Sequence, residues 1–549
     1  MKTYQYFTLS LLTLALCFIM GFTLYSEETI KTNFQTRLLA GEVWWGGLSV
    51  DGPQMPFSDT TQLERNLFGV NKGNQAQPLL ISSKGRYIWC EDPMSYSFDN
   101  GTLSVQSSKG EIITGTAGKT IVDAFNYSSA NFFPSNGQIP DPFMFKEPQY
   151  NTWIELTYNQ NEEDILQYAQ DIVDHGYPPG VLMIDDTWQE NYGDWEFAAR
   201  RFKDPKGMIE KLHALGFKVM LWVCPFISAD SDEFRYLAAE GMLILDEQKS
   251  QDILWANTQN KAAIVRWWNG ASAVLDLSNP RTREWFQDRL DYLVDEYGVD
   301  GYKFDAGDAH HYDSTMVSFV PGTTPNDHTT YFAKVGLKYP LNEYRASWKM
   351  AGLPLVQRLR DKFHKWEDLQ KLIPGIISEG LMGYAYVCPD MIGGGAYRSF
   401  LEGSVIDEEL VVRSAQVHAL MPMMQFSVAP WRVLSSENQR ICQKMAALHS
   451  SKGDLFVDLA LEASKSGKPI ARPLIYNYPN KEEYIPIIDQ FMIGTDLLVA
   501  PVVQKGERSR SVVFPKGKWK GDDGSIVRGP TTVKIEVPLD RLPYYERLK

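Results

Sequence analysis

Acidic residues follow several short apolar segments in the middle of the chain, close to the point where each segment ends. Asp185, Asp305, Asp361 and Asp390 all occupy such positions. If the segments are neighbouring parallel strands, their carboxyl ends meet at one edge and the side chains come together. Two carboxyl groups about 5 to 5.5 Å apart can cleave a glycosidic bond with retention, one attacking the anomeric carbon and the other protonating the leaving oxygen. The pattern therefore indicates carboxylate chemistry at strand ends.

Asp305 is the leading candidate for the nucleophile. It ends the apolar segment 302–304, and Gly307 leaves room beside it for a sugar ring. Lys303 lies two residues earlier on the same strand face, where its charge can keep the carboxylate ionised. Spacing alone leaves a second interpretation equally open, in which Asp305 is a structural residue that caps the next turn.

The segments that carry these residues alternate between strand and helix patterns. We expect strands at 153–157, 181–184, 218–223, 301–305, 354–359, 384–388 and 424–428, and helices at 161–176, 206–215 and 281–297. Such alternation predicts parallel βαβ units, in either a doubly wound sheet or a closed barrel. Acidic residues at several strand ends favour the barrel, because a doubly wound sheet gathers them at one switch point beside a glycine-rich loop. No such glycine motif follows any of these strands.

The predicted fold class is therefore α/β, with a TIM (β/α)8 barrel flanked by two β-rich regions. Short alternating segments broken by Gly, Asn, Ser and Asp predict an N-terminal β-sandwich at 27–150. The catalytic barrel is expected at 151–465. Short strands return afterwards and predict a C-terminal β-sandwich domain at 466–549.

The first residues and the overall charge bear on location and partners. An apolar stretch from Phe7 to Leu24 follows Lys2, which predicts a signal peptide over 1–26 or, alternatively, an N-terminal membrane anchor. We therefore expect an exported protein, periplasmic or extracellular, with membrane association through this segment only. The net charge of −14 disfavours binding to nucleic acid. The cysteines beyond Cys17 are scattered without metal-ligand spacing, so zinc binding is unsupported.

Longer motifs resemble a known family. The segment Asp300–Asp308 resembles the nucleophile strand of glycoside hydrolase family 31. Further similar segments follow in the expected order at 78–85, 218–225, 389–394 and 490–502. Over nearly the whole chain after the N-terminal segment, the sequence is therefore identified as similar to this family. The resemblance implies a retaining, exo-acting α-glycosidase that acts on an oligosaccharide or glycoside and uses no metal or organic cofactor.

The resemblance also implies roles for individual residues. Asp305 becomes the nucleophile and Asp361 the acid/base, so that Asp305 is expected ionised and Asp361 protonated at working pH. Arg360 stands where the family usually has Gly before the acid, which is a departure from its pattern. Residues expected to bind the substrate are Asp185, Trp188, Trp222, Lys303 and Gln425. Core packing is the alternative for Trp222.

The sugar specificity depends on a second departure. Gln425 and Ser427 stand where α-glucosidases of the family carry Arg and His. With Lys303 and Asp361, they make the chain most similar to the branch that contains bacterial α-galactosidases and the myogenesis-regulating glycosidase of animals. We therefore expect an α-galactosidase, with α-glucosidase or α-xylosidase as alternatives within the family.

Two alternatives come from other classes of protein. One is a non-catalytic carbohydrate-binding homologue, which would be free to lose either candidate carboxylate. The other is a metal-dependent barrel lyase. Its only sequence support is the adjacent pair His310 and His311, which sits on a predicted loop without an obvious partner set. The oligomeric state stays open.

Overall fold

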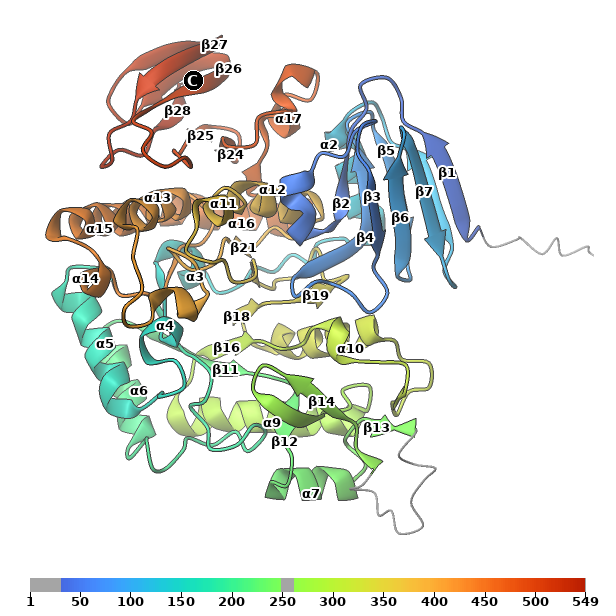
Figure 1. The fold of residues 1–549 in the computed structure, drawn as a ribbon, viewed down its shortest axis with the longest axis vertical. Coiled ribbons are helices and arrows are strands. Elements are labelled where there is room, and N and C mark those ends of the chain that lie inside the picture. The colour runs from blue at the N-terminus through green and yellow to red at the C-terminus, as the bar shows by residue number, and fades with distance from the viewer. Residues whose placement is uncertain (1–30, 248–260, 549) are drawn as a thin grey trace, which may run out of the picture.

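A parallel barrel occupies the centre of the molecule (Figure 1). The computed structural model describes residues 31–247 and 261–548, so the predicted signal peptide or anchor at 1–26 lies outside the described residues. The barrel strands are β9 (Gln149–Asn151), β10 (Val181–Ile184), β11 (Lys218–Val223), β16 (Gly301–Phe304), β18 (Leu341–Tyr344), β20 (Gln357–Arg358), β21 (Val387–Cys388) and β22 (Gln425–Phe426). They run in the order β21-β20-β18-β16-β11-β10-β9-β22. This confirms the predicted barrel.

The barrel closes between its two terminal strands. Met391, just after β21, forms a parallel bridge with Gln425 of β22. Next to it, the Ile392 amide donates a hydrogen bond to the Gln425 carbonyl at 2.8 Å. All strand pairs that surround the axis are therefore parallel, and their carboxyl ends open on one face.

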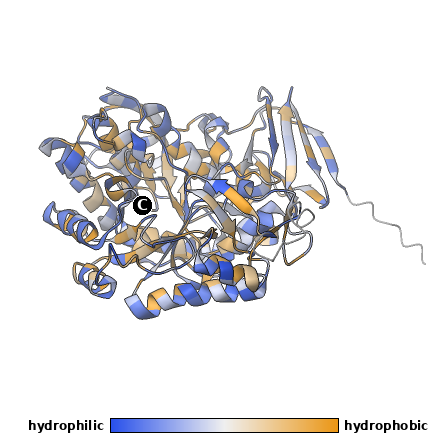
Figure 2. Cartoon of the chain, turned by 60° about the horizontal axis from the view of Figure 1, so that its bottom comes forward, coloured by the Kyte–Doolittle hydropathy of each residue, from blue (hydrophilic) through white to orange (hydrophobic). Residues whose placement is uncertain are grey.

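Helices cover the outside of the barrel. They include α5 (Glu162–Asp174), α6 (Pro205–Ala214), α9 (Pro280–Tyr297), α10 (Pro325–Val335), α12 (Leu372–Leu381) and α13 (Glu408–Ala419). Most carry both hydrophobic and hydrophilic residues (Figure 2), as expected of helices with one buried face. Strand β10 is apolar on both faces, and all four of its residues are fully buried. Within the described residues, no helix has the length and apolar character needed to span a membrane.

Two expected elements differ in the structure. The strand predicted at 153–157 is wrong: the first barrel strand is β9, and residues 153–156 form the short helix α4 (Trp153–Leu156). The turn begins because the Asn151 side chain accepts a hydrogen bond from the Trp153 amide at 2.8 Å. Strand β18 was not predicted. Its polar residues Asn342 and Glu343 hide the apolar pattern, yet both are buried.

The N-terminal region consists of two antiparallel β-layers. One is β1 (Asn33–Arg37), β7 (Thr102–Ser107), β6 (Met94–Asp99) and β3 (Leu63–Asn66); the other contains β2 (Trp44–Leu48), β4 (Gln75–Ser82), β5 (Arg86–Cys90) and β8 (Ile112–Thr116). A barrel segment joins the second layer, because β19 (Ser347–Trp348) pairs in parallel with the start of β4. This pairing fixes the N-terminal region to the strand-end loop that follows β18.

The C-terminal region, expected as a sandwich, is one six-stranded sheet in the structure. Its strands are β23 (Ala471–Arg472), β24 (Phe491–Ile493), β25 (Leu497–Val499), β28 (Tyr544–Leu548), β26 (Ser509–Gly521) and β27 (Ile526–Glu536). Helix α12 of the barrel contacts β2 and, at another part of its surface, β23. The barrel therefore carries a β-rich region on each side of this helix (Figure 1).

Candidate active site

A pocket of about 480 Å³ opens at the carboxyl ends of the barrel strands. It brings together five of the seven residues predicted for the site: Asp185, Trp222, Lys303, Asp305 and Asp361. They come from β10, β11, β16 and the loop after β20, which are distant in sequence and meet only through the barrel. The floor is deeply buried, since the side chains of Asp185 and Lys303 are each 4% exposed.

Asp305 sits at the end of β16 with its carboxylate fixed on both sides. Trp222 Nε1 donates a hydrogen bond to Oδ2 at 2.9 Å, and the Ala306 amide donates one to Oδ1 at 2.8 Å. Burial by itself would raise the pKa of Asp305. The positive charges of Arg345, Lys303 and Arg358 outweigh this effect and lower the pKa below its usual range. An ionised, oriented carboxylate of this kind is suited to nucleophilic attack.

Lys303 binds Asp185 on the floor of the pocket. Its Nζ donates to Asp185 Oδ2 at 2.6 Å, and both groups are buried. The two charges therefore neutralise each other, while Lys303 still lies close enough to Asp305 to stabilise its ionised form. The floor offers a carboxylate acceptor and an ammonium donor to a polar ligand.

Asp361 lines the same pocket, three residues beyond Arg358. Its Oδ1 accepts a hydrogen bond from Arg358 Nη1 at 2.8 Å, and its side chain keeps 35% exposure. Burial tends to raise the pKa of Asp361, but Arg358, then Arg345 and Lys303, lower it to about 2. The acid/base candidate is therefore ionised in the ligand-free protein, which differs from the expectation that it holds a proton.

Arg358 contacts several acidic side chains at once. It is 1% exposed and contacts Glu343 at 3.2 Å and Asp390 at 2.8 Å, in addition to Asp361. The sequence pattern did not single it out. Asp390 is fully buried and bound to Arg358, which indicates a structural role for this strand-end acid.

Asp186, the residue after Asp185, also lines the pocket. Tyr192 donates a hydrogen bond to it from its hydroxyl at 2.9 Å, and Asn269 donates a second one from its amide. Burial, followed by the neighbouring charge of Asp185, raises the pKa of Asp186 to about 7. A carboxyl group with this pKa changes its charge close to neutral pH.

Two residues predicted to bind substrate lie beneath the pocket and do not line it. Trp188 is fully buried, and its Nε1 donates to the Trp222 carbonyl at 2.8 Å. Gln425 is also fully buried and binds Glu343 at 2.7 Å, because it starts β22 one layer below the strand ends. The Ser427 side chain is also engaged within the protein, since its Oγ accepts a hydrogen bond from the Ile154 amide. Trp188 and Gln425 therefore contact residues at and below the pocket floor and are not part of its lining.

The N-terminal region completes the pocket. Asn74 and Gln75 each donate a side-chain hydrogen bond to the Arg345 and Arg358 carbonyls, and Asn74 accepts one from the Arg360 amide. Lys72, from the same loop, lines the mouth. A loop that precedes the barrel in sequence by many residues therefore holds two of its strand-end loops in place.

Comparison with known proteins supports the expected family. Residues 142–449 match the family model described as "Glycosyl hydrolases family 31 TIM-barrel domain", and residues 467–548 match the model for the family's C-terminal domain. The chain belongs to glycosyl hydrolase family 31. The predicted resemblance is thereby confirmed.

Relatives within family 31 include proteins of several named specificities. The chain is 33% identical over 432 residues to the myogenesis-regulating glycosidase of Mus musculus, covering 77% of this chain and 59% of that protein. It is 26% identical to alpha-glucosidase 2 of Bacillus thermoamyloliquefaciens, covering 70% of this chain and 50% of that protein. The chain thus spans about half to three-fifths of the length of these relatives.

Solved structures of family 31 share the fold. The Flavobacterium johnsoniae dextranase complexed with glucose superposes with a TM-score of 0.79 at 20% identity, covering 94% of this chain and 66% of that one. An alpha-xylosidase from a soil metagenome complexed with xylose gives a TM-score of 0.79 at 19% identity, with coverage of 94% and 79%. Both likenesses concern the architecture.

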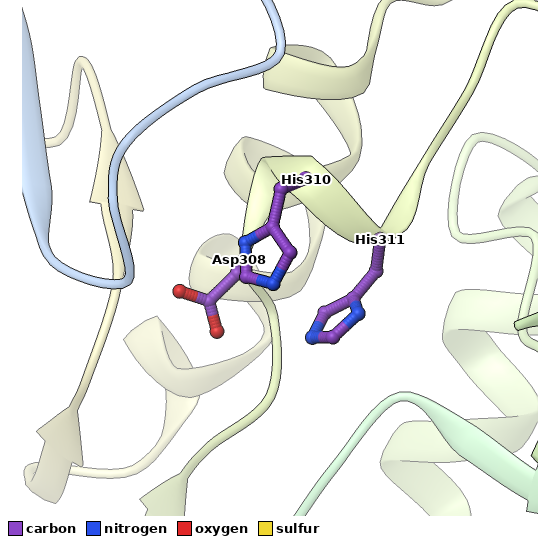
Figure 3. A group of neighbouring side chains, drawn as sticks. All are labelled: Asp308, His310 and His311. Atoms are coloured by element: carbon purple, nitrogen blue, oxygen red, sulfur yellow. The ribbon is translucent and has the colours of Figure 1, made fainter. Parts of the chain in front are cut away.

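One further cluster of this family 31 protein borders the pocket. Asp308, His310 and His311 bring ligand-type atoms within 4.8 Å of one another, and Figure 3 shows the two imidazoles on the short helix η3 (Ala309–His311) beside the carboxylate. Asp308 thus adds a third ligand-type residue to the histidine pair, which the sequence did not reveal. Arg345 Nε lies 3.4 Å from Asp308 Oδ2 and 3.8 Å from Asp305 Oδ1. Asp308 therefore holds a guanidinium close to Asp305.

Arg345 is the most important residue that the sequence analysis missed. It follows β18, the unpredicted strand, and it lines the pocket between Asp305 and Asp308. Its guanidinium also lies over the Trp268 ring, 4.9 Å from the centroid. A polar residue directly after a correctly assigned strand would have been the signal that could reveal it.

Proposed function

We propose that the protein is a retaining, exo-acting α-glycosidase that hydrolyses terminal α-linked sugars. The observation that carries this proposal is the meeting of Asp305 and Asp361 in one pocket whose floor is sealed by the buried Asp185–Lys303 pair. A pocket closed at one end admits only the end of a sugar chain, which favours exo action. Two carboxyl groups that face one cavity are the equipment of a retaining glycosidase.

The reaction would proceed in two steps. Asp305 attacks the anomeric carbon, the bond to the aglycone oxygen breaks, and Asp361 gives that oxygen a proton; the product is a glycosyl ester on Asp305. In the second step Asp361 takes a proton from water, which attacks the anomeric carbon and releases Asp305. Two inversions give net retention. Trp222 and Arg345 keep Asp305 oriented and ionised before the attack.

Within this class, we propose that α-galactosides are the preferred substrates. The sequence support is the similarity carried by Lys303, Asp361 and the segment around Gln425. In a dead-end pocket the hydroxyls farthest from the anomeric carbon, O4 among them, reach the floor. There Asp185 and Lys303 form a buried donor–acceptor pair whose geometry can discriminate an axial from an equatorial O4.

A panel of 4-nitrophenyl α-glycosides tests both levels of the proposal. The purified protein should cleave the α-galactoside with higher kcat/KM than the α-glucoside or α-xyloside at the same pH. The Asp305→Asn variant serves as the matched control and should be inactive on all of them. A preference for glucose or xylose would overturn the galactose assignment alone, whereas no turnover of any α-glycoside would overturn the proposed function.

We also propose that the protein is exported. The support is the apolar stretch from Phe7 to Leu24 behind Lys2. Fractionation of the producing cells should find the protein outside the cytoplasm, and N-terminal sequencing would separate a cleaved signal peptide from a retained anchor. Recovery in the cytoplasm would contradict the proposal.

A further inference from the structure

Cationic side chains crowd the mouth of the pocket. Lys72 comes from the N-terminal loop, Arg360 from the loop after β20, and Arg398 from the short helix η5 (Tyr397–Phe400). All three are solvent-exposed. Through residues 31–247 and 261–548, none of the three forms an ion pair with an Asp or Glu side chain. Three separate parts of the fold therefore place an unneutralised positive charge at one opening.

The cations deeper in the pocket, by contrast, all have carboxylate partners. Lys303 is paired with Asp185, Arg345 lies between Asp305 and Asp308, and Arg358 binds Asp361. Among the cations that line the pocket, those without an acidic partner are thus at the rim. Because the whole chain has a net charge of −14, a locally positive opening is not a reflection of its composition.

The backbone at Lys72 adds an independent sign of function. Lys72 has a φ of 52°, in the left-handed region that Gly or Asn occupies at lower cost. A Lys side chain in this conformation is strained, and such strain concentrates at functional sites. Hydrogen bonds from Asn74 and Gln75 to the barrel hold the loop in place, so the backbone at Lys72 stays at the rim.

Aromatic side chains lie next to these cations. Phe363 is 55% exposed, and both it and Tyr397 line the same mouth. The Arg398 guanidinium lies 5.9 Å from the centre of the Tyr397 ring. Apolar ring faces beside positive charges suit a leaving group that has a flat or sugar-like body and an acidic substituent.

We propose, on the basis of the proposed glycosidase function, that the leaving group of the natural substrate carries an anionic substituent that binds to Lys72, Arg360 and Arg398. The terminal sugar occupies the balanced floor, and the anion stays at the rim beyond Asp361. A carboxylate, a sulfate ester or a phosphate ester would each provide the required chemistry.

An anion at the rim also helps the acid. Burial tends to raise the pKa of Asp361, but the buried cations outweigh this effect and lower the pKa to about 2. Asp361 is therefore ionised in the ligand-free protein. A negative charge that arrives with the substrate disfavours a second negative charge nearby, so it raises the pKa of Asp361. The correct substrate would thereby help to load the proton that its own leaving oxygen needs.

Matched aryl α-galactosides test the proposal. The aglycones carry a carboxylate, a sulfate or a phosphate at the meta position, and the reference carries a neutral carboxamide there. We expect kcat/KM to be on the order of tenfold higher for at least one anionic aglycone, with an advantage that shrinks as salt is added. The anion with the largest advantage identifies the substituent. Ratios near one for all three would overturn the proposal. No turnover of any of these compounds would overturn the galactose assignment, and no turnover in the 4-nitrophenyl α-glycoside panel as well would overturn the glycosidase function itself.

Single substitutions locate the effect. Lys72→Gln, Arg360→Gln and Arg398→Gln should each reduce the anionic-to-neutral ratio by about twofold to fivefold. Lys334→Gln, which removes an exposed cation at the end of α10, is the matched control and should leave the ratio unchanged. An anionic preference that survives in all three rim variants would contradict the assignment of these residues.

Discussion

Nη1 of the buried Arg358 donates a hydrogen bond to Oδ1 of Asp361 across 2.8 Å. This contact holds the acid/base candidate in its ionised form, because the pKa of Asp361 is lowered to about 2 once Arg358, Arg345 and Lys303 outweigh the effect of burial. The free protein therefore has the protonation state that the second half of the proposed reaction needs, in which Asp361 acts as a base. The first half requires a proton on the same group.

The pH dependence of catalysis should reveal this state. For an α-galactoside with a poor alkyl leaving group, kcat/KM should fall about tenfold per pH unit from about pH 5 to about pH 8, because kcat/KM follows the free enzyme. The 4-nitrophenyl galactoside leaves without a proton and should show a much flatter profile. Parallel profiles for the two substrates would contradict the assignment of a low pKa to the catalytic acid.

Replacement of Asp361 tests its role directly. Asp361→Ala should slow the alkyl galactoside by roughly 10²- to 10⁴-fold and the nitrophenyl galactoside far less. Azide can enter the space left by the side chain and should restore turnover of the nitrophenyl substrate, giving the α-galactosyl azide. Glu367→Ala is the matched control, since that residue is exposed and lies outside the pocket. Equal losses on both substrates without azide rescue would refute the acid/base role.

The buried pair on the floor makes a prediction about stability. Lys303→Met leaves Asp185 buried without its partner and should lower the free energy of unfolding by about 3 to 5 kcal/mol. The double variant Lys303→Met/Asp185→Leu removes both charges and should recover most of this loss, yet remain inactive. Urea unfolding of the three proteins checks the cycle. Additive losses in the double variant would show that the two side chains do not stabilise each other.

Asp186 predicts a pH-dependent stability. Its pKa is about 7 in the folded protein, raised chiefly by burial, so the folded state holds a proton that the unfolded chain releases near pH 4. The resulting stabilisation is complete below about pH 4 and is lost at about 1.4 kcal/mol per pH unit as the pH rises to about 7. Asp186→Asn should lack this slope. Urea unfolding of both proteins at intervals over this pH range measures the difference. Parallel plots of the free energy of unfolding against pH for the two proteins would contradict the prediction.

Most of the residues predicted for the candidate site lie in one pocket, for a simple physical reason. Asp185, Lys303 and Asp305 lie in or directly after apolar strands, and a parallel barrel brings such strand ends together. Trp222 is on the neighbouring strand and reaches Asp305, as a wall residue should. The pattern identifies such residues because one rule, the polar end of a buried strand, positions all of them.

The residues that the sequence did not reveal are not positioned by the end of a recognisable apolar strand. Arg345 depends on β18, where buried Asn342 and Glu343 bind other barrel groups and mask the strand. Lys72 reaches the mouth from another region of the chain, a contact that no local pattern encodes. The distance of a residue from the pocket was not predictable either. Strand periodicity indicates that Gln425 faces the barrel interior, but it does not tell how far below the pocket the residue lies.

The identity of the nucleophile is the central claim, and covalent trapping tests it most directly. A 5-fluoro-α-galactosyl fluoride should inactivate the protein by forming a glycosyl ester that turns over slowly, because the fluorine at C5 destabilises the transition states of both steps. Peptide mapping by mass spectrometry should then place the added mass on the peptide that contains Asp305, and Asp305→Asn should acquire no label. Labelling of any other carboxylate, in either protein, would contradict the account.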